Sequence, residues 1–238
     1  MTSIEKTTAQ LFKKQFKHTI KTYVILAILF DCIALLILLN SHAESPSILI
    51  LLLFPWILLS YLYRNKESEA RSHFWRKFAK DHVWKYHATR DLSSENGQML
   101  SRGTDSLIQN YVSGKINDRP VRIFEYEIII KEQDNDSYTH PYTVFAFKFA
   151  GKFPEIFLNY RDDNYSMGFP NKLPVPLEFE KDFHLFAPQK YEIEALAIFT
   201  PDIFHYLLEQ QWVCDVELSG QELIIFSPGF IENSLELE

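Results

Sequence analysis

The histidines and carboxylates of this chain do not have the spacing of a metal site. His82 and His87 are five residues apart across an expected helix–strand boundary, and neither has a cysteine or acidic partner at ligand spacing. The acidic runs at 132–136 and 162–164 could hold a hard cation. However, the first lacks the glycine at the sixth position and the glutamate at the twelfth position of an EF-hand. We therefore expect solvated loops, no metal and no cofactor.

Nucleophilic chemistry is equally poorly supported. The chain has no Gly-x-Ser-x-Gly and no phosphate-binding loop, and its seven glycines leave no room for a glycine-rich one. Cys32 and Cys214 are too few for a disulfide framework, which favours a reducing compartment. Cys214 lies in an apolar stretch typical of a structural thiol. We identify no catalytic residue and do not expect an enzyme, although a hydrolase with an unrecognised site stays open.

Asp31 is the carboxyl group with unusual surroundings, because it lies within an apolar run. The run Thr22–Leu39 has about 18 residues, the run Ser47–Tyr63 has about 17, and a short polar loop joins them. At about 1.5 Å per residue, each run crosses most of a hydrocarbon core about 30 Å thick. We predict a two-helix transmembrane hairpin over residues 22–63. The alternatives are a pair of buried core helices or a cleaved signal peptide.

Folding this hairpin about its loop places Trp56 opposite Asp31, beside Pro55. An ionisable group in a membrane is costly and faces protein or water. We predict a membrane-interior polar contact in which Asp31 is protonated, accepts a hydrogen bond from the Trp56 indole or pairs with another subunit. A proton or ion pathway is the functional alternative, and a tolerated polar residue that fixes helix association is the simpler one.

Charge is strongly segregated along the chain, although the net charge is only −7. The N-terminal segment 1–21 carries +4, residues 22–63 carry −2, residues 64–90 carry +5, and residues 91–238 carry −14. Positive flanks on both sides of the hairpin predict that both termini are cytoplasmic and that the protein is a two-pass protein of the cell membrane. The −14 region would repel phosphate, so we expect no nucleic-acid partner.

Residues 64–83 continue from the second apolar run without a helix-breaking signal and mix basic with aromatic side chains. This mixture is typical of an interfacial helix on anionic lipid. The predicted juxtamembrane lipid contacts are Arg71, Trp75, Arg76 and Lys77. The alternative is a connector whose aromatic stripe packs on the following domain.

Residues 84–230 are predicted to form a cytoplasmic α+β domain with a largely antiparallel sheet and one or two packed helices, followed by an acidic tail at 231–238. A tight turn is expected at 117–118, further turns at 151–154 and 161–172, and a hairpin around Gly220. Thr200-Pro201-Asp202 predicts a helix start. Expected strands are 83–90, 108–115, 120–130, 142–150, 155–160, 177–179, 184–187, 213–218 and 222–226.

The segment Pro176–Gln210 resembles the C-terminal signature of a family of bacterial membrane proteins of unknown function. In that family an acidic and aromatic E-x-x-F-x-x-x-F run precedes a Thr-Pro pair. Here the matching residues are Glu178, Asp182-Phe183, Phe186, Ala195-Leu196 and Ile198–Pro201. The resemblance implies a two-helix membrane hairpin ahead of the domain. It implies no activity, because none is established for the family.

These features together predict a membrane-anchored, non-catalytic binding or scaffold protein. Its acidic cytoplasmic domain would present an exposed aromatic or acidic surface to a protein partner or to a second copy of the chain. The alternative is an accessory subunit of a membrane transport or envelope-assembly complex, with Asp31 in an intramembrane contact.

Overall fold

A computed structural model of the protein describes residues 21–33, 35, 47–91, 95–101, 106–131, 137–161 and 171–231. They belong to two compact units, one ending at His73 and the other beginning at Phe74. The segment 1–20, the acidic runs at 132–136 and 162–164, and the tail after Ile231 lie outside the described residues.

The first unit contains helical residues 21–33 and most of helix α2, which spans Ser47–Asp81 with Pro55 inside it. The absence of a break after the second apolar run is confirmed, because α2 continues through it to Asp81. Over the ranges that the structure describes, no helix combines the length and the hydropathy that a membrane crossing needs. The loop 40–46 lies outside those ranges, and the transmembrane hairpin stays a prediction.

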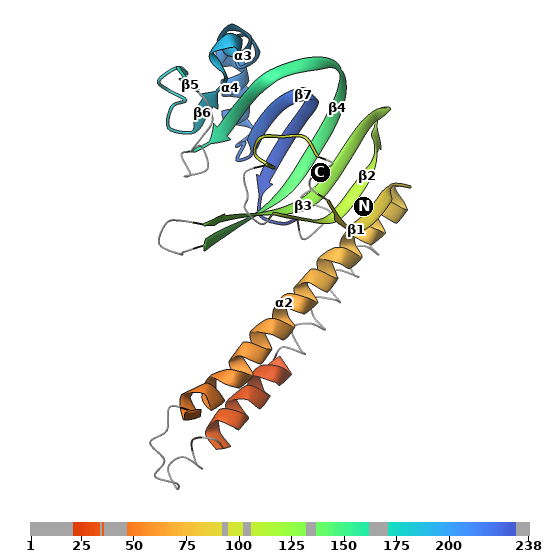
Figure 1. Ribbon diagram of the computed structural model, residues 1–238, viewed down its shortest axis with the longest axis vertical. Coiled ribbons are helices and arrows are strands. Elements are labelled where there is room, and N and C mark those ends of the chain that lie inside the picture. Colours follow the sequence, from red (N-terminus) through yellow and green to blue (C-terminus); the bar gives the residue numbers. More distant parts are fainter. Residues whose placement is uncertain are drawn as a thin grey trace. The chain divides into compact units, whose positions relative to one another are not determined.

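The second unit is built on one antiparallel sheet of seven strands in the order β1-β2-β3-β4-β6-β5, with β7 also paired to β4 (Figure 1). With the two helices α3 (Glu192–Ile198) and α4 (Pro201–Glu209) it confirms the α+β class. The strands are β1 (Lys85–Arg90), β2 (Leu107–Ile116), β3 (Arg119–Lys131), β4 (Ser137–Tyr160), β5 (Lys172–Leu173), β6 (Phe183–Phe186) and β7 (Asp215–Pro228).

The turn between β2 and β3 lies where the sequence predicts it. Ile116 pairs with Arg119, and Asn117 and Asp118 both have positive φ, 49° and 61°. Two consecutive left-handed residues make the hairpin turn that matches the strand twist, and Asn and Asp tolerate that conformation. The turn fixes the register, so Arg122, Phe124 and Tyr126 lie on one face of β3, and Ile123 and Glu125 lie on the other.

Two expected turns are instead irregularities within long strands. β4 runs unbroken through Gly151, and β7 runs unbroken through Gly220, which has φ 59°. The β4–β7 register shifts between Lys148 and Phe153 and again between Phe153 and Ile156, with Phe153 opposite Gly220. The predicted hairpin around Gly220 is therefore wrong. Its glycine relieves backbone strain at a bulge between two paired strands.

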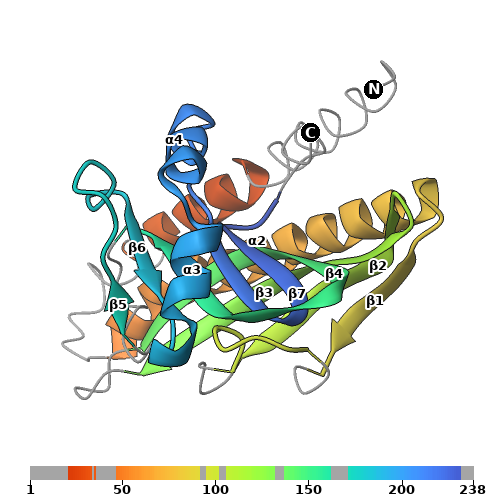
Figure 2. The ribbon, with the colours of Figure 1, turned by 90° about the horizontal axis from the view of Figure 1, so that it is seen from above.

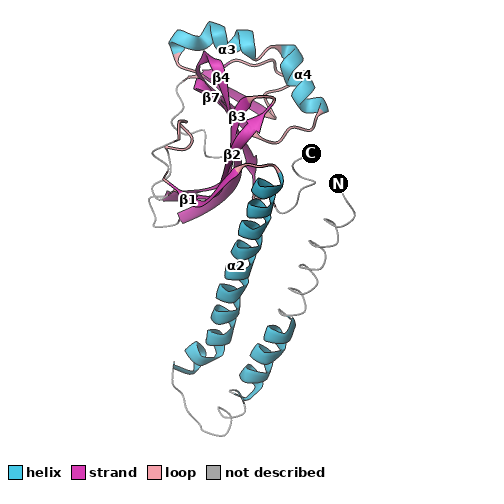
Figure 3. Ribbon diagram, turned by 90° about the vertical axis from the view of Figure 1, so that its right-hand side faces the viewer, coloured by secondary structure: helices cyan, strands magenta, loops and turns pink. Residues whose placement is uncertain are grey.

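Helices α3 (Glu192–Ile198) and α4 (Pro201–Glu209) follow a 3-10 turn at Gln189–Tyr191. The predicted start of α4 is confirmed: Thr200 is the N-cap residue and has an extended backbone, and Pro201 lies in the first turn. The two helices lie with β5 and β6 at the end of the sheet away from β1 (Figures 1 and 2). Figure 3 also shows α3 and α4 at the end away from β1. The predicted strand at 177–179 is wrong, because these residues form a turn in which Phe179 N donates to Pro176 O.

Candidate functional site

A buried ionic cluster joins the residue-95 loop to β3 and β7. Arg122 Nη1 lies 3.1 Å from Glu95 Oε2, and Arg122 Nη2 lies 2.7 Å from Glu222 Oε1. The side chains of Glu95 and Glu222 are only 1% and 5% exposed. Arg90 also lies 3.9 Å from Glu95, and its guanidinium stands 4.3 Å above the Tyr111 ring.

Burial shifts the pKa of two groups in this cluster, Glu95 and Tyr111. It raises the pKa of Glu95, even though Arg122 and Arg90 oppose that shift. Burial and the adjacent Glu95 carboxylate raise the pKa of Tyr111 to about 12. Because both carboxylates are almost wholly enclosed, the cluster cannot present a general acid or base to a substrate, and we interpret it as structural.

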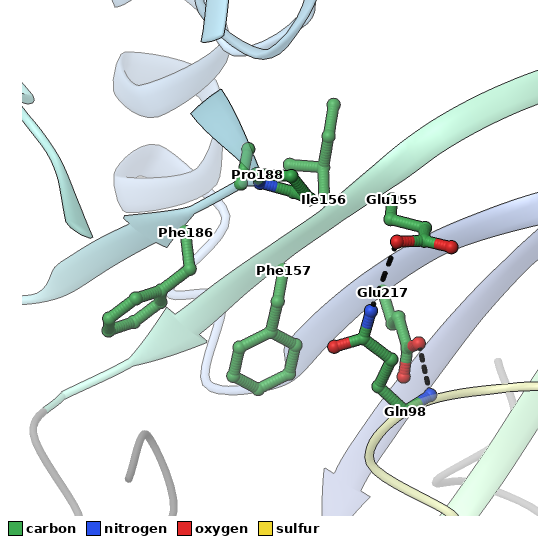
Figure 4. Close-up of a pocket in the computed structure, with 8 residues that line it drawn as sticks. Gln98, Glu155, Ile156, Phe157, Phe186, Pro188 and Glu217 are labelled. Atoms are coloured by element: carbon green, nitrogen blue, oxygen red, sulfur yellow. Dashed lines mark hydrogen bonds between the residues drawn. The ribbon is translucent and has the colours of Figure 1, made fainter. Parts of the chain in front are cut away.

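Glu217 on β7 holds the turn at residues 98–101. Its Oε1 accepts a hydrogen bond from Gln98 N at 2.5 Å, and its Oε2 accepts one from Met99 N at 3.1 Å. Glu217 therefore fastens the 98–101 turn to the sheet directly. Glu222, on the other side of the Gly220 bulge, pairs instead with Arg122, which also pairs with Glu95. The recess beside this turn, lined by Gln98, Glu155, Phe157 and Phe186 among others, has a volume of about 10 Å³ (Figure 4). That volume accommodates one water molecule and no organic ligand.

A second buried network fastens the C-terminal end of α2 to the opposite face of β3. Trp75 Nε1 donates to Glu125 Oε1 at 2.9 Å, and Asn110 Nδ2 donates to Glu125 Oε2 at 2.8 Å. Tyr86 Oη in turn donates to Asn110 Oδ1 at 2.9 Å. Trp75 has no solvent-exposed surface, so its predicted lipid contact is wrong, and for this residue the alternative of packing on the domain is realised.

The basic residues predicted beside Trp75 have varied surroundings. Arg76 is exposed, with its guanidinium 5.4 Å from the centre of the Tyr86 ring, and Lys77 is exposed. In the first unit Arg71 pairs with Glu67 at 3.2 Å. Lipid contact by these three residues stays a prediction.

In the first unit, Trp56 Nε1 donates to Asp31 Oδ2 at 2.7 Å. This bond is one of the three arrangements predicted for Asp31, and the position of the contact inside a membrane stays a prediction. Asp31 Oδ1 is buried and has no hydrogen-bond partner among the described residues. The carboxyl group therefore retains one unused acceptor in largely apolar surroundings.

The two histidines that the sequence analysis singled out, His82 and His87, contact aromatic rings. His82 stacks on Phe78, and His87 meets the edge of Tyr111. Within the described ranges no group of three or more His, Cys, Asp or Glu could hold a metal ion. Cys214 lies just before β7, and burial raises the pKa of its thiol.

Among the described residues of the second unit, α3, α4 and the turn before β6 expose several large apolar side chains. Each helix has an apolar pair three residues apart that faces solvent: Ile193 and Leu196 on α3, and Ile203 and Tyr206 on α4. Ile193 is 82% exposed and Tyr206 is 58% exposed. Leu177 in the turn is 83% exposed. We call these five residues the α3–α4 face.

The inward sides of α3 and α4 pack into the hydrophobic core, which holds both helices in place. Ala195, Phe204 and Leu207 are buried in a core shared with β5, β6 and the first half of β7. Phe204 stacks on Phe179 with ring centres 5.2 Å apart. The outward pairs are thus displayed by anchored helices, and their exposure does not result from fraying.

Exposed acidic residues adjoin the residues of the α3–α4 face along the sequence. Glu192, Glu194, Asp202 and Glu209 are exposed on the helices, and Glu178 lies 3.5 Å from the ring of His205. The segment 176–210 contains seven acids and two lysines, a net charge of −5. Sequence reasoning noted the acidic and aromatic character of this segment but did not identify these residues as a site. The i, i+3 apolar pairs on the outer side of each helix were the available signal.

Comparison with known proteins adds little to this description. No protein-family model matches the sequence, and no curated protein matches it. The fold is similar to the crystal structure of the mycobacterial trehalose monomycolate transport factor A, TtfA, with a TM-score of 0.48 and 14% sequence identity. The match covers 66% of this chain and 82% of that chain. A likeness this distant supports no functional conclusion.

Proposed function

We propose that this protein is a membrane-anchored, non-catalytic binding protein that presents its acidic α+β unit to a protein partner at the cytoplasmic face of the cell membrane. The two apolar runs and their positive flanks support the anchor and its orientation. The α3–α4 face is the observation that carries the binding role. Exposed apolar side chains with a polar rim are typical of protein interaction sites.

The interior of the second unit supports binding at a surface over binding in a pocket. Among the described residues of this unit, the recess beside Glu217 holds no more than a water molecule. The carboxylates of Glu95, Glu125, Glu217 and Glu222 are buried and engaged in fastening the fold together. Ligand sites are ordinarily much larger concavities with a few converging polar groups.

Photocrosslinking in cells tests this proposal. A benzoylphenylalanine residue at Tyr206 or Ile193 should give a discrete adduct with another protein on irradiation. The same residue at Leu107 or Ile116, which are both 46% exposed on β2, is the matched control and should give none. Equal adducts from all four positions, or none from any, would contradict a binding role for this face.

A second candidate is an accessory subunit of a membrane transport or envelope-assembly complex. It is favoured by the unused Oδ1 acceptor of Asp31, which a donor from a neighbouring membrane helix would satisfy. Asp31→Leu should then reduce the size of the particle purified in mild detergent. Trp56→Phe, which removes only the internal donor, should leave that size unchanged. An unchanged particle in Asp31→Leu rules this contact out.

A further inference from the structure

We propose that the α3–α4 face binds a basic amphipathic α-helix of a partner protein. This inference rests on the proposed function and adds the chemistry of the partner. Ile193 and Leu196, and likewise Ile203 and Tyr206, recur at helical spacing on the outer side of their helices. Short helices that expose such pairs offer an apolar strip for the nonpolar side of another helix.

The sign of the surrounding charge selects among possible occupants. Segment 176–210 has net charge −5, and the exposed acids Glu192, Glu194, Asp202 and Glu209 flank the apolar pairs. A second copy docked face to face would bring these acids against their own equivalents. An anionic lipid surface or a nucleic acid would also be repelled. A helix with Lys and Arg beside its apolar stripe brings complementary charge to the same face.

The two lysines of segment 176–210 lie outside α3 and α4, so they do not neutralise the acidic residues of these helices. Lys190 Nζ stands 4.6 Å from the centre of the Tyr191 ring, before α3 begins. Lys181 lies in the turn ahead of β6. Neither belongs to α3 or α4, and the two helices contain no Lys or Arg.

The test uses the full chain in nanodiscs of phosphatidylcholine and two synthetic helical peptides of equal length. Both peptides have the same leucine stripe, and their polar positions are all Lys in one and all Glu in the other. We expect the Lys peptide to bind at least about tenfold more tightly than the Glu peptide, and this preference to shrink between about 0.05 M and about 0.5 M NaCl. Empty nanodiscs give the background. Equal binding of the two peptides overturns the proposal.

Two pairs of variants locate the binding. Ile193→Ser with Tyr206→Ser should weaken the Lys peptide by at least about tenfold, whereas Leu107→Ser with Ile116→Ser should not. Glu192→Gln with Glu194→Gln should reduce the salt dependence. The matched pair Asp81→Asn with Glu127→Gln changes the net charge equally outside the face and should not. Equal losses in the matched pairs overturn the proposal.

Two further outcomes separate this inference from the function on which it rests. A photocrosslinked partner at Tyr206 together with no binding of the Lys peptide rejects the basic helix but keeps the protein-binding role. A peptide of residues 1–21, which carries +4, is a third probe. If it binds more tightly than the Lys peptide and depends on Ile193 and Tyr206, the occupant is this chain's own N-terminal segment, and the external partner is rejected.

Discussion

The indole Nε1 of Trp75 lies 2.9 Å from Oε1 of Glu125, with both side chains buried and 50 residues apart in the sequence. Trp75 belongs to the last turns of α2, and Glu125 lies in the middle of β3. Asn110 donates to the second oxygen of the same carboxylate. A buried carboxylate is tolerated when donors surround it, so these two bonds fasten the end of α2 to the sheet.

A double-mutant cycle measures this contact. Trp75→Phe leaves the Glu125 oxygen short of a donor, and Glu125→Leu leaves the indole without an acceptor. We expect each single change to cost about 2–4 kcal/mol of unfolding free energy, since each strands a buried polar group. The two changes should be non-additive by about 1.5–3 kcal/mol in urea unfolding. Additive effects, to within about 0.5 kcal/mol, would show that the bond contributes nothing.

The surroundings of Trp75 also show what a sequence can and cannot predict. Aromatic residues at helical spacing mixed with arginine and lysine are compatible with a lipid surface and with a sheet surface, and the pattern is the same in both cases. Only the position of Glu125 distinguishes them, and that depends on a contact across 50 residues. The helix itself was predictable, because its signal is local.

The same division holds in the sheet. The turn at Asn117 and Asp118 was predictable, because two residues that tolerate positive φ separate two β-rich runs. Gly220 carries a similar turn signal but lies in a bulge of β7, since its role is set by its partner Phe153 on β4. Pairing between distant strands decided this case, and the sequence pattern alone contains no information about it.

The burial of Glu125 could have been predicted from its position in the strand pattern. Glu125 shares a strand face with Val121 and Ile123, where a solvated acid is not expected. An acidic residue on the apolar face of a strand indicates that a hydrogen-bond donor or a cation is buried beside it. The identity of that partner, Trp75 here and Arg122 for Glu222, comes only from the tertiary structure.

Gly114 on β2 should not tolerate a side chain. A Cβ at this position would lie 2.2 Å from Cδ2 of Trp84, and the indole cannot yield as the end of a flexible chain would. Gly114→Ala should therefore destabilise the fold by about 1–3 kcal/mol in urea unfolding, and Trp84→Leu should recover part of that loss. Gly151→Ala, whose Cβ would meet nothing within 4 Å, is the matched control and should be near neutral. Equal effects at the two glycines would contradict this packing.

The stability contribution of Glu95 should depend on pH in the direction opposite to that of most surface acids. Its folded-state pKa is raised by burial, so the protonated form is the one that folding favours. Stability from this group is fully present below the unfolded pKa of about 4.3 and is lost as the pH rises through the folded value. The unfolding free energy of the wild type, minus that of Glu95→Gln, should thus decrease from about pH 4 to pH 7. An increase over that range would mean that Arg122 and Arg90 outweigh burial.

Glu217 should control the mobility of the turn at residues 98–101. Its two oxygens accept from the amides of Gln98 and Met99, so Glu217→Gln turns one acceptor into a donor that faces a donor. We expect the global stability to fall by about 1.5–3 kcal/mol, because hydrogen bonds to a charged group are lost. Hydrogen exchange in a peptide covering residues 95–101 should accelerate more than in a peptide from the paired region of β3 and β4. Glu155→Gln is the matched control, since its contact with the Gln98 side chain is exposed and 3.4 Å long, and it should change neither quantity.

If hydrogen exchange in 95–101 is as slow in Glu217→Gln as in the wild type, other contacts hold the turn. The first of these to examine is the hydrogen bond that the Tyr126 hydroxyl donates to Leu100 O at 3.0 Å.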